Sequence, residues 1–207
     1  MSQQTRSSHA DEDPRRHYFE ELAPRWDVDG QDPGGTVERL EALADQLQLQ
    51  PGMDLLEVGC GTGQITGWLA ARVAPGQVVA VDFAEAMLAQ ARRKQLAAEF
   101  RRADVCRDPL GQRCFDVVLC FHSFPHFRDQ AAALRNLASA LRPGGRLMVM
   151  HLAGSAQINA FHDEVGGAVA GDHLPSCADW ECLLAQAGLQ IRQFLDHDDL
   201  FLLVAGS

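Results

Sequence analysis

A glycine-rich run, Glu57-Val58-Gly59-Cys60-Gly61-Thr62-Gly63, has the residue types of a loop that holds a nucleotide-like ligand. It follows an apolar run at 53–58 and precedes a segment at 64–73 that favours a helix. Glycines lack a Cβ atom, so they permit positive φ and let a ligand approach the backbone closely. The N-terminus of a helix presents unpaired N–H groups that suit an anionic group. The order strand, turn, helix therefore predicts a binding loop in an α/β domain.

The spacing of these glycines distinguishes the loop from two others. A dinucleotide-binding loop requires Gly-x-Gly-x-x-Gly, and the third glycine would fall where the chain has Gln64. The glutamine at position 64 conflicts with the binding loop of an NAD-dependent oxidoreductase. A P-loop requires Gly-Lys-Ser/Thr, and no such tripeptide follows Gly63.

Two aspartates stand where predicted strands end. Asp82 closes the apolar run 77–81 and lies 19 residues past Gly63. In a βαβ unit that position lies at the end of the neighbouring strand, where a carboxylate accepts hydrogen bonds from a ribose hydroxyl pair. Because a helix follows, Asp82 could instead cap that helix; we favour the ribose interpretation. Asp104 follows the next predicted strand, 99–103, in the same way.

Histidines are the second group of residues that could do chemistry. The chain has eight, and three of them follow the ends of predicted strands 115–120 and 146–151. Imidazole titrates near neutral pH, so such residues can bind or deprotonate a substrate. They could also bind a metal or simply line a pocket. His122 and His126 have the spacing of two ligands on a helix, but Pro125 argues against a regular helix there. We favour a polar substrate pocket and predict no metal site. The second half of the chain contains His122, His126, His151, His162 and His173.

The elements that must position these residues alternate between apolar strands and amphipathic helices, which is typical of a parallel α/β sheet. Predicted strands span 53–58, 77–81, 99–103, 115–120, 146–151, 189–195 and 200–205, and predicted helices include 37–47, 64–73, 84–96 and 180–187. Residues 155–171 look less regular. The four residues 196–199 are too few for a crossover, so the last two strands must be antiparallel. The sequence therefore predicts a mostly parallel seven-stranded sheet with an antiparallel C-terminal strand.

The glycine-rich run resembles the first motif of the class I S-adenosylmethionine (SAM)-dependent methyltransferases. The segment Leu141-Arg142-Pro143-Gly144-Gly145-Arg146-Leu147 and the aromatic segment 18–27 are similar to segments of the small-molecule members, above all the ubiquinone/menaquinone-biosynthesis branch. The resemblance covers residues 17–205. It implies a Rossmann-like three-layer sandwich, SAM as cofactor with S-adenosylhomocysteine (SAH) as product, and in-line methyl transfer to a small-molecule acceptor. The cofactor-binding residues that it implies are Glu57, Gly59, Cys60, Gly61, Gly63, Asp82, Phe83, Met87, Asp104, Val105 and Phe121.

Within that resemblance, Met87 would lie against the adenine and Asp104 would accept from its amino group. Substrate residues would be Tyr18, Trp26 and His122, although the aromatic segment could instead be a helix docked by one face. A general base is needed only if the acceptor arrives protonated; His126 is then the first candidate, His151 the second, and His162 the third, which could also orient the substrate. The alternative is a SAM- or metal-binding regulatory module that uses the histidines without turnover.

Composition restricts the partners and the compartment. The 207 residues carry a net charge of −10 and no run of Lys or Arg, which disfavours a nucleic-acid partner. No apolar stretch approaches the ~20 residues of a membrane span, and residues 1–16 lack the apolar core of a secretory signal. Six cysteines without a Cys-x-x-Cys pair favour a reduced, cytoplasmic protein.

We expect a disordered tail at 1–16 and one domain at 17–207, with a helical cap at 17–50 and a lid or substrate insert at 152–180. A monomer or homodimer is expected.

Overall fold

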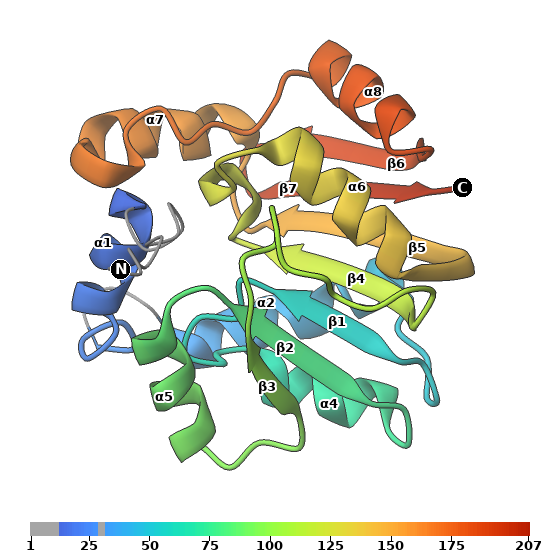
Figure 1. Cartoon of the computed structure of the whole chain (residues 1–207), viewed down its shortest axis with the longest axis horizontal. Coiled ribbons are helices and arrows are strands. Elements are labelled where there is room, and N and C mark those ends of the chain that lie inside the picture. The colour runs from blue at the N-terminus through green and yellow to red at the C-terminus, as the bar shows by residue number, and fades with distance from the viewer. Residues whose placement is uncertain (1–12, 29–31) are drawn as a thin grey trace, which may run out of the picture.

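The computed structural model describes residues 13–28 and 32–207, and it is an α/β sandwich built on one seven-stranded sheet (Figure 1). The strand order is β3-β2-β1-β4-β5-β7-β6, and β7 runs antiparallel to both of its neighbours. The predicted fold class is therefore confirmed. The antiparallel C-terminal strand β7 lies between β5 and the edge strand β6. The strands are β1 (Leu55–Val58), β2 (Val78–Asp82), β3 (Glu99–Arg102), β4 (Phe115–Phe121), β5 (Leu141–His151), β6 (Gln190–His197) and β7 (Leu200–Gly206).

Helices cover both faces of the sheet because successive strand residues point to opposite sides. In β1, Leu56 packs in the cluster that includes α6 and α8, whereas Leu55 packs in the cluster that includes α2 and α4. Both residues are fully buried. The helices are α1 (Pro14–Leu22), α2 (Pro33–Ala42), α3 (Ala44–Leu47), α4 (Thr66–Val73), α5 (Glu85–Arg93), α6 (Gln130–Ala140), α7 (Ser155–Val165) and α8 (Cys177–Gln186), with short 3-10 turns η2 (Phe124–His126) and η3 (Gly167–Val169).

The N-terminal region departs from the sequence prediction. Residues 1–12 of the predicted tail lie outside the described residues, but Asp13 accepts a hydrogen bond from the Arg15 amide and caps α1. Pro14 occupies the first turn, where its missing N–H costs nothing. Residues 14–16 are therefore helical. Likewise Asp32 caps α2, so this helix begins at residue 33, before the start of the helix predicted at 37–47; residues 29–31 lie outside the described part.

The segment predicted as irregular, 155–171, begins with the three-turn helix α7. Gly166 ends this helix with a φ of 67°, and η3 follows. In Figure 1, α7 and α1 lie on the side of the sheet to which the parallel strands point. Helix α1 packs against α5 and η3 there, through Phe19, Met87 and Val169. These two segments therefore cover the sheet edge where ligands bind in open α/β folds. Within residues 13–28 and 32–207, none of the helices has both the length and the apolar character of a membrane span.

Candidate active site

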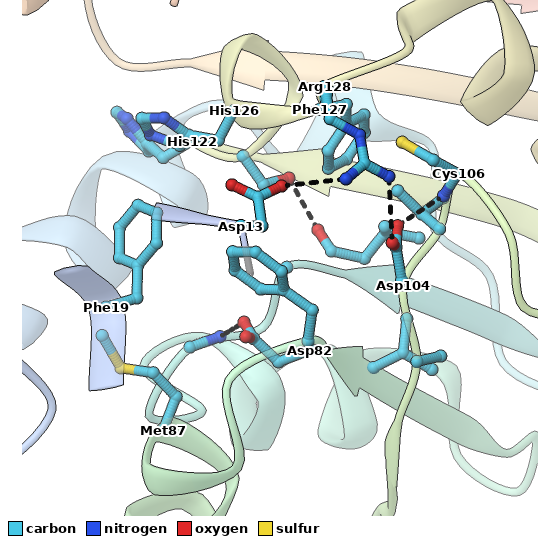
Figure 2. Close-up of a pocket in the computed structure, with 18 of the residues that line it drawn as sticks. Asp13, Phe19, Asp82, Met87, Asp104, Cys106, His122, His126, Phe127 and Arg128 are labelled. Atoms are coloured by element: carbon cyan, nitrogen blue, oxygen red, sulfur yellow. Dashed lines mark hydrogen bonds and ion pairs between the residues drawn. The ribbon is translucent and has the colours of Figure 1, made fainter. Parts of the chain in front are cut away.

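A cavity opens at the carboxyl ends of β1, β2, β3 and β4, beneath the N-terminal segment (Figure 2). The space of this first cavity is about 740 Å³ when the open solvent at its mouth is included. Most of the residue types that line it are apolar, with carboxylates and imidazoles among them. The lining residues are Asp13, Phe19, Trp26, Val58, Gly59, Gly61, Val81, Asp82, Phe83, Met87, Ala103, Asp104, Val105, Cys106, His122, Ser123, His126, Phe127 and Arg128.

Glycines form one wall of the first cavity for reasons of geometry. Gly59 and Gly61 have φ values of 71° and 54°, in the region that favours glycine. A Cβ atom at Gly59 would also stand 2.4 Å from Cβ of Ser123, in the loop after β4. Ser123 Oγ donates a 2.6 Å hydrogen bond to the carbonyl of Val58. The loops after β1 and β4 are thus held together at a distance that only glycine allows.

The carboxylate of Asp82 accepts hydrogen bonds from two backbone amides. Its Oδ2 accepts a 2.8 Å hydrogen bond from the Gly61 amide, and its Oδ1 accepts a 2.9 Å bond from the Ala84 amide at the start of α5. Burial raises the pKa of Asp82 to about 6, against the opposing effect of these backbone donors. Each carboxylate oxygen keeps acceptor capacity after one such bond. Asp82 can therefore order the glycine loop and still accept hydrogen bonds from a ligand in the cavity.

The far end of the first cavity contains the predicted Phe83, Met87, Asp104 and Val105. Asp104 accepts a 2.9 Å hydrogen bond from the Cys106 amide. Arg128 forms ion pairs with Asp104 at 3.7 Å and with Asp13 at 3.6 Å. Figure 2 marks both contacts with dashed lines. Arg128 therefore connects the cap of α1 with this end of the cavity.

Four residues predicted to bind the cofactor lie outside the lining of the first cavity: Glu57, Cys60, Gly63 and Phe121. Phe121 points to the face of the sheet covered by α4, and Cys60 packs against Ala80 and Leu88. Glu57 accepts a 2.6 Å hydrogen bond from the hydroxyl of Thr66 at the start of α4. These residues therefore pack within the glycine-rich run or at the end of β4 and have no position in the lining of the first cavity.

The carboxyl of Glu57 predicts a measurable pH dependence of stability. Burial raises its pKa to about 8, the Thr66 hydroxyl opposes this, and the charge of Asp82 adds to it. A group whose pKa is higher in the folded state stabilises fully below its unfolded value, 4.5, and loses that contribution as pH rises through about 8. Glu57→Gln removes this titration. Between pH 5 and pH 8 we expect the wild type to lose on the order of 3 kcal/mol more unfolding free energy than the variant, measured by urea denaturation; equal pH slopes would contradict the assignment.

His126 forms the centre of a polar network beside the first cavity. Its Nδ1 lies 2.8 Å from Oδ2 of Asp172, which is 2% exposed. Arg15 of α1 donates from Nε and Nη2 to the same carboxylate, at 2.9 and 2.5 Å to Oδ1. The ring of His162 lies 4.8 Å from that of His126, and its Nδ1 is 2.5 Å from the carbonyl of Asp172. Burial lowers the pKa of His162, and the nearby His126 acts in the same direction.

The other two predicted histidines are placed differently. His122 lines the first cavity rather than a separate substrate site, and its Nε2 accepts from the Leu152 amide at 3.2 Å. His151 is 2% exposed, packs between His122 and Phe201, and lines neither cavity. Burial lowers the pKa of His151 well below its usual value. His151 therefore contributes no surface to either cavity, and its role as a base stays a prediction.

A second cavity, of about 710 Å³ including its mouth, lies between α1 and α7. It contains the predicted Tyr18 and His162, and it shares Phe19, Trp26 and His126 with the first cavity. Its lining consists of Tyr18, Phe19, Leu22, Arg25, Trp26, His126, Phe161, His162 and Val169. His126 therefore stands at the junction of two cavities, one against the glycine loop and one against helix α7.

The sequence prediction missed residues that the chain brings in from a distance. Asp172 lies 46 residues beyond His126, and no spacing rule connects them. Phe19 is adjacent to Tyr18, and its helical phase could have placed it on the buried face of α1. Arg128 follows a segment already assigned to the site, but its partner Asp13 comes from the other end of the chain. Within the described part of the chain, no three or more His, Cys, Asp or Glu side chains converge to hold a metal ion.

Comparison with known families gives a match over the sheet half that carries the first cavity. A family model described as a methyltransferase domain matches residues 55–145. The demethylmenaquinone methyltransferase of Thermus thermophilus is 36% identical over 138 residues, which cover 64% of this chain and 63% of that protein. The ubiquinone/menaquinone biosynthesis C-methyltransferase UbiE of Roseobacter denitrificans is 28% identical over 204 residues, 90% of this chain and 78% of that one.

The chain matches only part of the length of two curated relatives and shares its fold with a solved methyltransferase. The chain spans 63% and 57% of the length of the demethylmenaquinone methyltransferases from Thermus thermophilus and Deinococcus radiodurans. Magnesium protoporphyrin IX methyltransferase from Synechocystis PCC 6803, solved with bound SAH, superposes with a TM-score of 0.68 at 22% identity. That superposition covers 92% of this chain and 97% of the other, and it shows a shared fold.

Proposed function

The chain belongs to the class I SAM-dependent methyltransferases, and on this premise we propose that it transfers a methyl group from SAM to a small-molecule acceptor. The observation that carries the proposal is the first cavity, in which the glycine loop and Asp82 meet at the carboxyl ends of the parallel strands. This is the edge at which open α/β sheets bind nucleotide-like ligands.

The residues of the first cavity fit the chemical groups of SAM. The Asp82 carboxylate is a suitable acceptor for the two ribose hydroxyls. Phe83, Met87 and Val105 provide apolar surface for the adenine, and Asp104 is an acceptor for its amino group. Gly61 leaves room for close approach of the remaining chain. We propose these residues as the cofactor site, with Glu57, Cys60, Gly63 and Phe121 supporting it from behind.

The protein's contribution to the reaction is alignment and exclusion of water. When bound, SAM supplies an electrophilic methyl group on a positively charged sulfur. Phe19 and Trp26 cover both cavities, so the aromatic segment shields the junction between them. Holding two reactants in line can lower a barrier by ~7–11 kcal/mol. His126 removes the proton of the acceptor where one is present, and His162 orients the acceptor.

Calorimetric titration of the purified protein with SAM, SAH and NAD tests the proposal. We expect micromolar affinity for SAM and SAH and no measurable heat with NAD, because position 64 is Gln and not Gly. A folded protein that binds neither SAM nor SAH, or that prefers NAD, would overturn the proposal.

We propose that the protein acts in a reducing compartment such as the cytoplasm. All six cysteines are free thiols, which supports this location.

A further inference from the structure

The second cavity has the lining of a site for a planar apolar molecule. Tyr18, Phe19, Trp26 and Phe161 contribute aromatic rings, and Phe161 is 59% exposed. Aromatic side chains pair favourably with aromatic ligands in edge-to-face and offset arrangements. Among the described residues that line this cavity, the side chain of fixed charge is the cation Arg25. Arg25 and the two histidines, His126 and His162, supply the basic side chains of this lining.

The polar groups of this cavity are arranged as a base and its support. A carboxylate that accepts from Nδ1 of an imidazole fixes the tautomer and leaves Nε2 free to take a proton. Asp172 holds this position against His126 at 2.8 Å. Burial alone would raise the pKa of Asp172, but the hydrogen bonds from His126 and Arg15 outweigh burial and hold its pKa below the usual value. Asp172 is therefore an ionised partner.

The chemical class of the acceptor follows from the presence of such a base. A thiolate or an acidic carbon reaches a sulfonium without a strong need for help, whereas a hydroxyl must lose its proton. We propose that the acceptor is a planar aromatic molecule with a phenol-type hydroxyl, seated in the second cavity, and that His126, held by the positioning residue Asp172, takes the hydroxyl proton. This inference rests on the proposed methyltransferase function.

The step balances with these groups alone. The acceptor oxygen forms a bond to the methyl carbon while the bond from that carbon to the sulfonium sulfur breaks. The electron pair of the broken bond stays on sulfur. The hydroxyl proton passes to His126 Nε2 and then to water. Charged or titratable groups around His126 are Asp172, Arg15 of α1, His162 of α7, His151 of β5 and His122 of the same loop.

The acceptor class is tested with 2-naphthol as the aromatic probe and cyclohexanol as a hydroxyl without an aromatic ring, each titrated into the SAH-saturated protein. We expect 2-naphthol to bind at least about tenfold more tightly. Phe161→Ala should weaken 2-naphthol about tenfold, whereas Val28→Ala should not, because Val28 is exposed but lies outside both cavities. Equal affinity for the two probes, or no effect of Phe161→Ala, would overturn the aromatic assignment. Failure of SAH itself to bind would instead refute the proposed function.

The base is tested without turnover, because ionised 2-naphthol absorbs at a longer wavelength than the neutral form. Transfer of its proton to His126 should let the bound hydroxyl ionise at least about one pH unit below the free probe. His126→Gln should abolish this shift and Asp172→Asn should remove most of it. Asp163→Asn is the matched control, since Asp163 pairs with His173 at the surface. If the Asp172→Asn variant does not fold, the His126→Gln variant still tests whether His126 takes the hydroxyl proton. A bound hydroxyl that ionises identically in the wild type and His126→Gln would refute the role of His126.

Discussion

Asp82→Asn is expected to weaken SAM and SAH binding by at least about 100-fold. Two hydrogen bonds from ribose hydroxyls to a carboxylate contribute roughly 1.5–3 kcal/mol each, and an amide replaces one acceptor oxygen with a donor. The same change places an NH₂ group against a backbone amide, since both oxygens of Asp82 accept from Gly61 or Ala84. Calorimetry measures the affinity, and Asp45→Asn, in the short helix α3 and outside the lining of both cavities, is the control.

The pH dependence of SAM binding gives a second test at Asp82 without a substitution. Because burial raises its pKa to about 6, the carboxyl of the free protein is mostly protonated at pH 5 and mostly ionised at pH 7. The ribose hydroxyls prefer the ionised form, so binding should release a proton. Affinity should fall about tenfold from pH 7 to pH 5 in the wild type and stay flat in Asp82→Asn. An Asp82→Asn protein that remains folded and binds SAM normally would refute the ribose assignment.

The parts of the molecule that sequence could predict are those governed by local rules. Alternating apolar strands and helical stripes indicated the order of the elements, and the glycine run located the loop after β1. Asp82 and Asp104 were found because each follows a strand directly, and the ends of neighbouring parallel strands meet at one edge of the sheet. Helix α7 was missed although Ile158, Phe161 and Val165 recur at helical spacing and Gly166 provides a helix-end signal.

The parts that sequence could not predict depend on which distant segments meet. His126 and His151 both follow predicted strands, and nothing local separates them. The structure separates them because His126 lies on η2 beside Asp172, whereas His151 ends β5 and packs against Phe201 of β7. The carboxylate of Asp172 comes from the segment after η3, and the arginine that holds this carboxylate comes from α1. Such a network is visible only after three chain segments have been placed in space.

Gly59→Ala is expected to be the most destabilising single change in the glycine loop. A side chain at a φ of 71° costs about 1–2 kcal/mol. The new Cβ would also stand 2.4 Å from Ser123 Cβ, and forcing extra atoms into packed structure adds roughly 1–3 kcal/mol. A total of about 3 kcal/mol should lower the melting temperature by roughly 6–12 °C in a chain of this size. Thermal denaturation measures the change, and SAH binding should weaken with it because Gly59 lines the first cavity.

Two further variants separate the backbone strain at Gly59 from the contact. Gly144 has a φ of 80°, and a Cβ atom added there would meet nothing within 4 Å, so Gly144→Ala should cost only the strain of about 1–2 kcal/mol. Ser123→Gly removes the colliding atom together with the hydrogen bond to Val58. In a double-mutant cycle, Gly59→Ala and Ser123→Gly should couple by roughly 1–3 kcal/mol, with the pair less destabilised than the sum. Additive effects would mean that φ alone requires glycine at 59. Coupling would mean that the approach of the β1 and β4 loops requires it, and this approach builds the wall of the cavity.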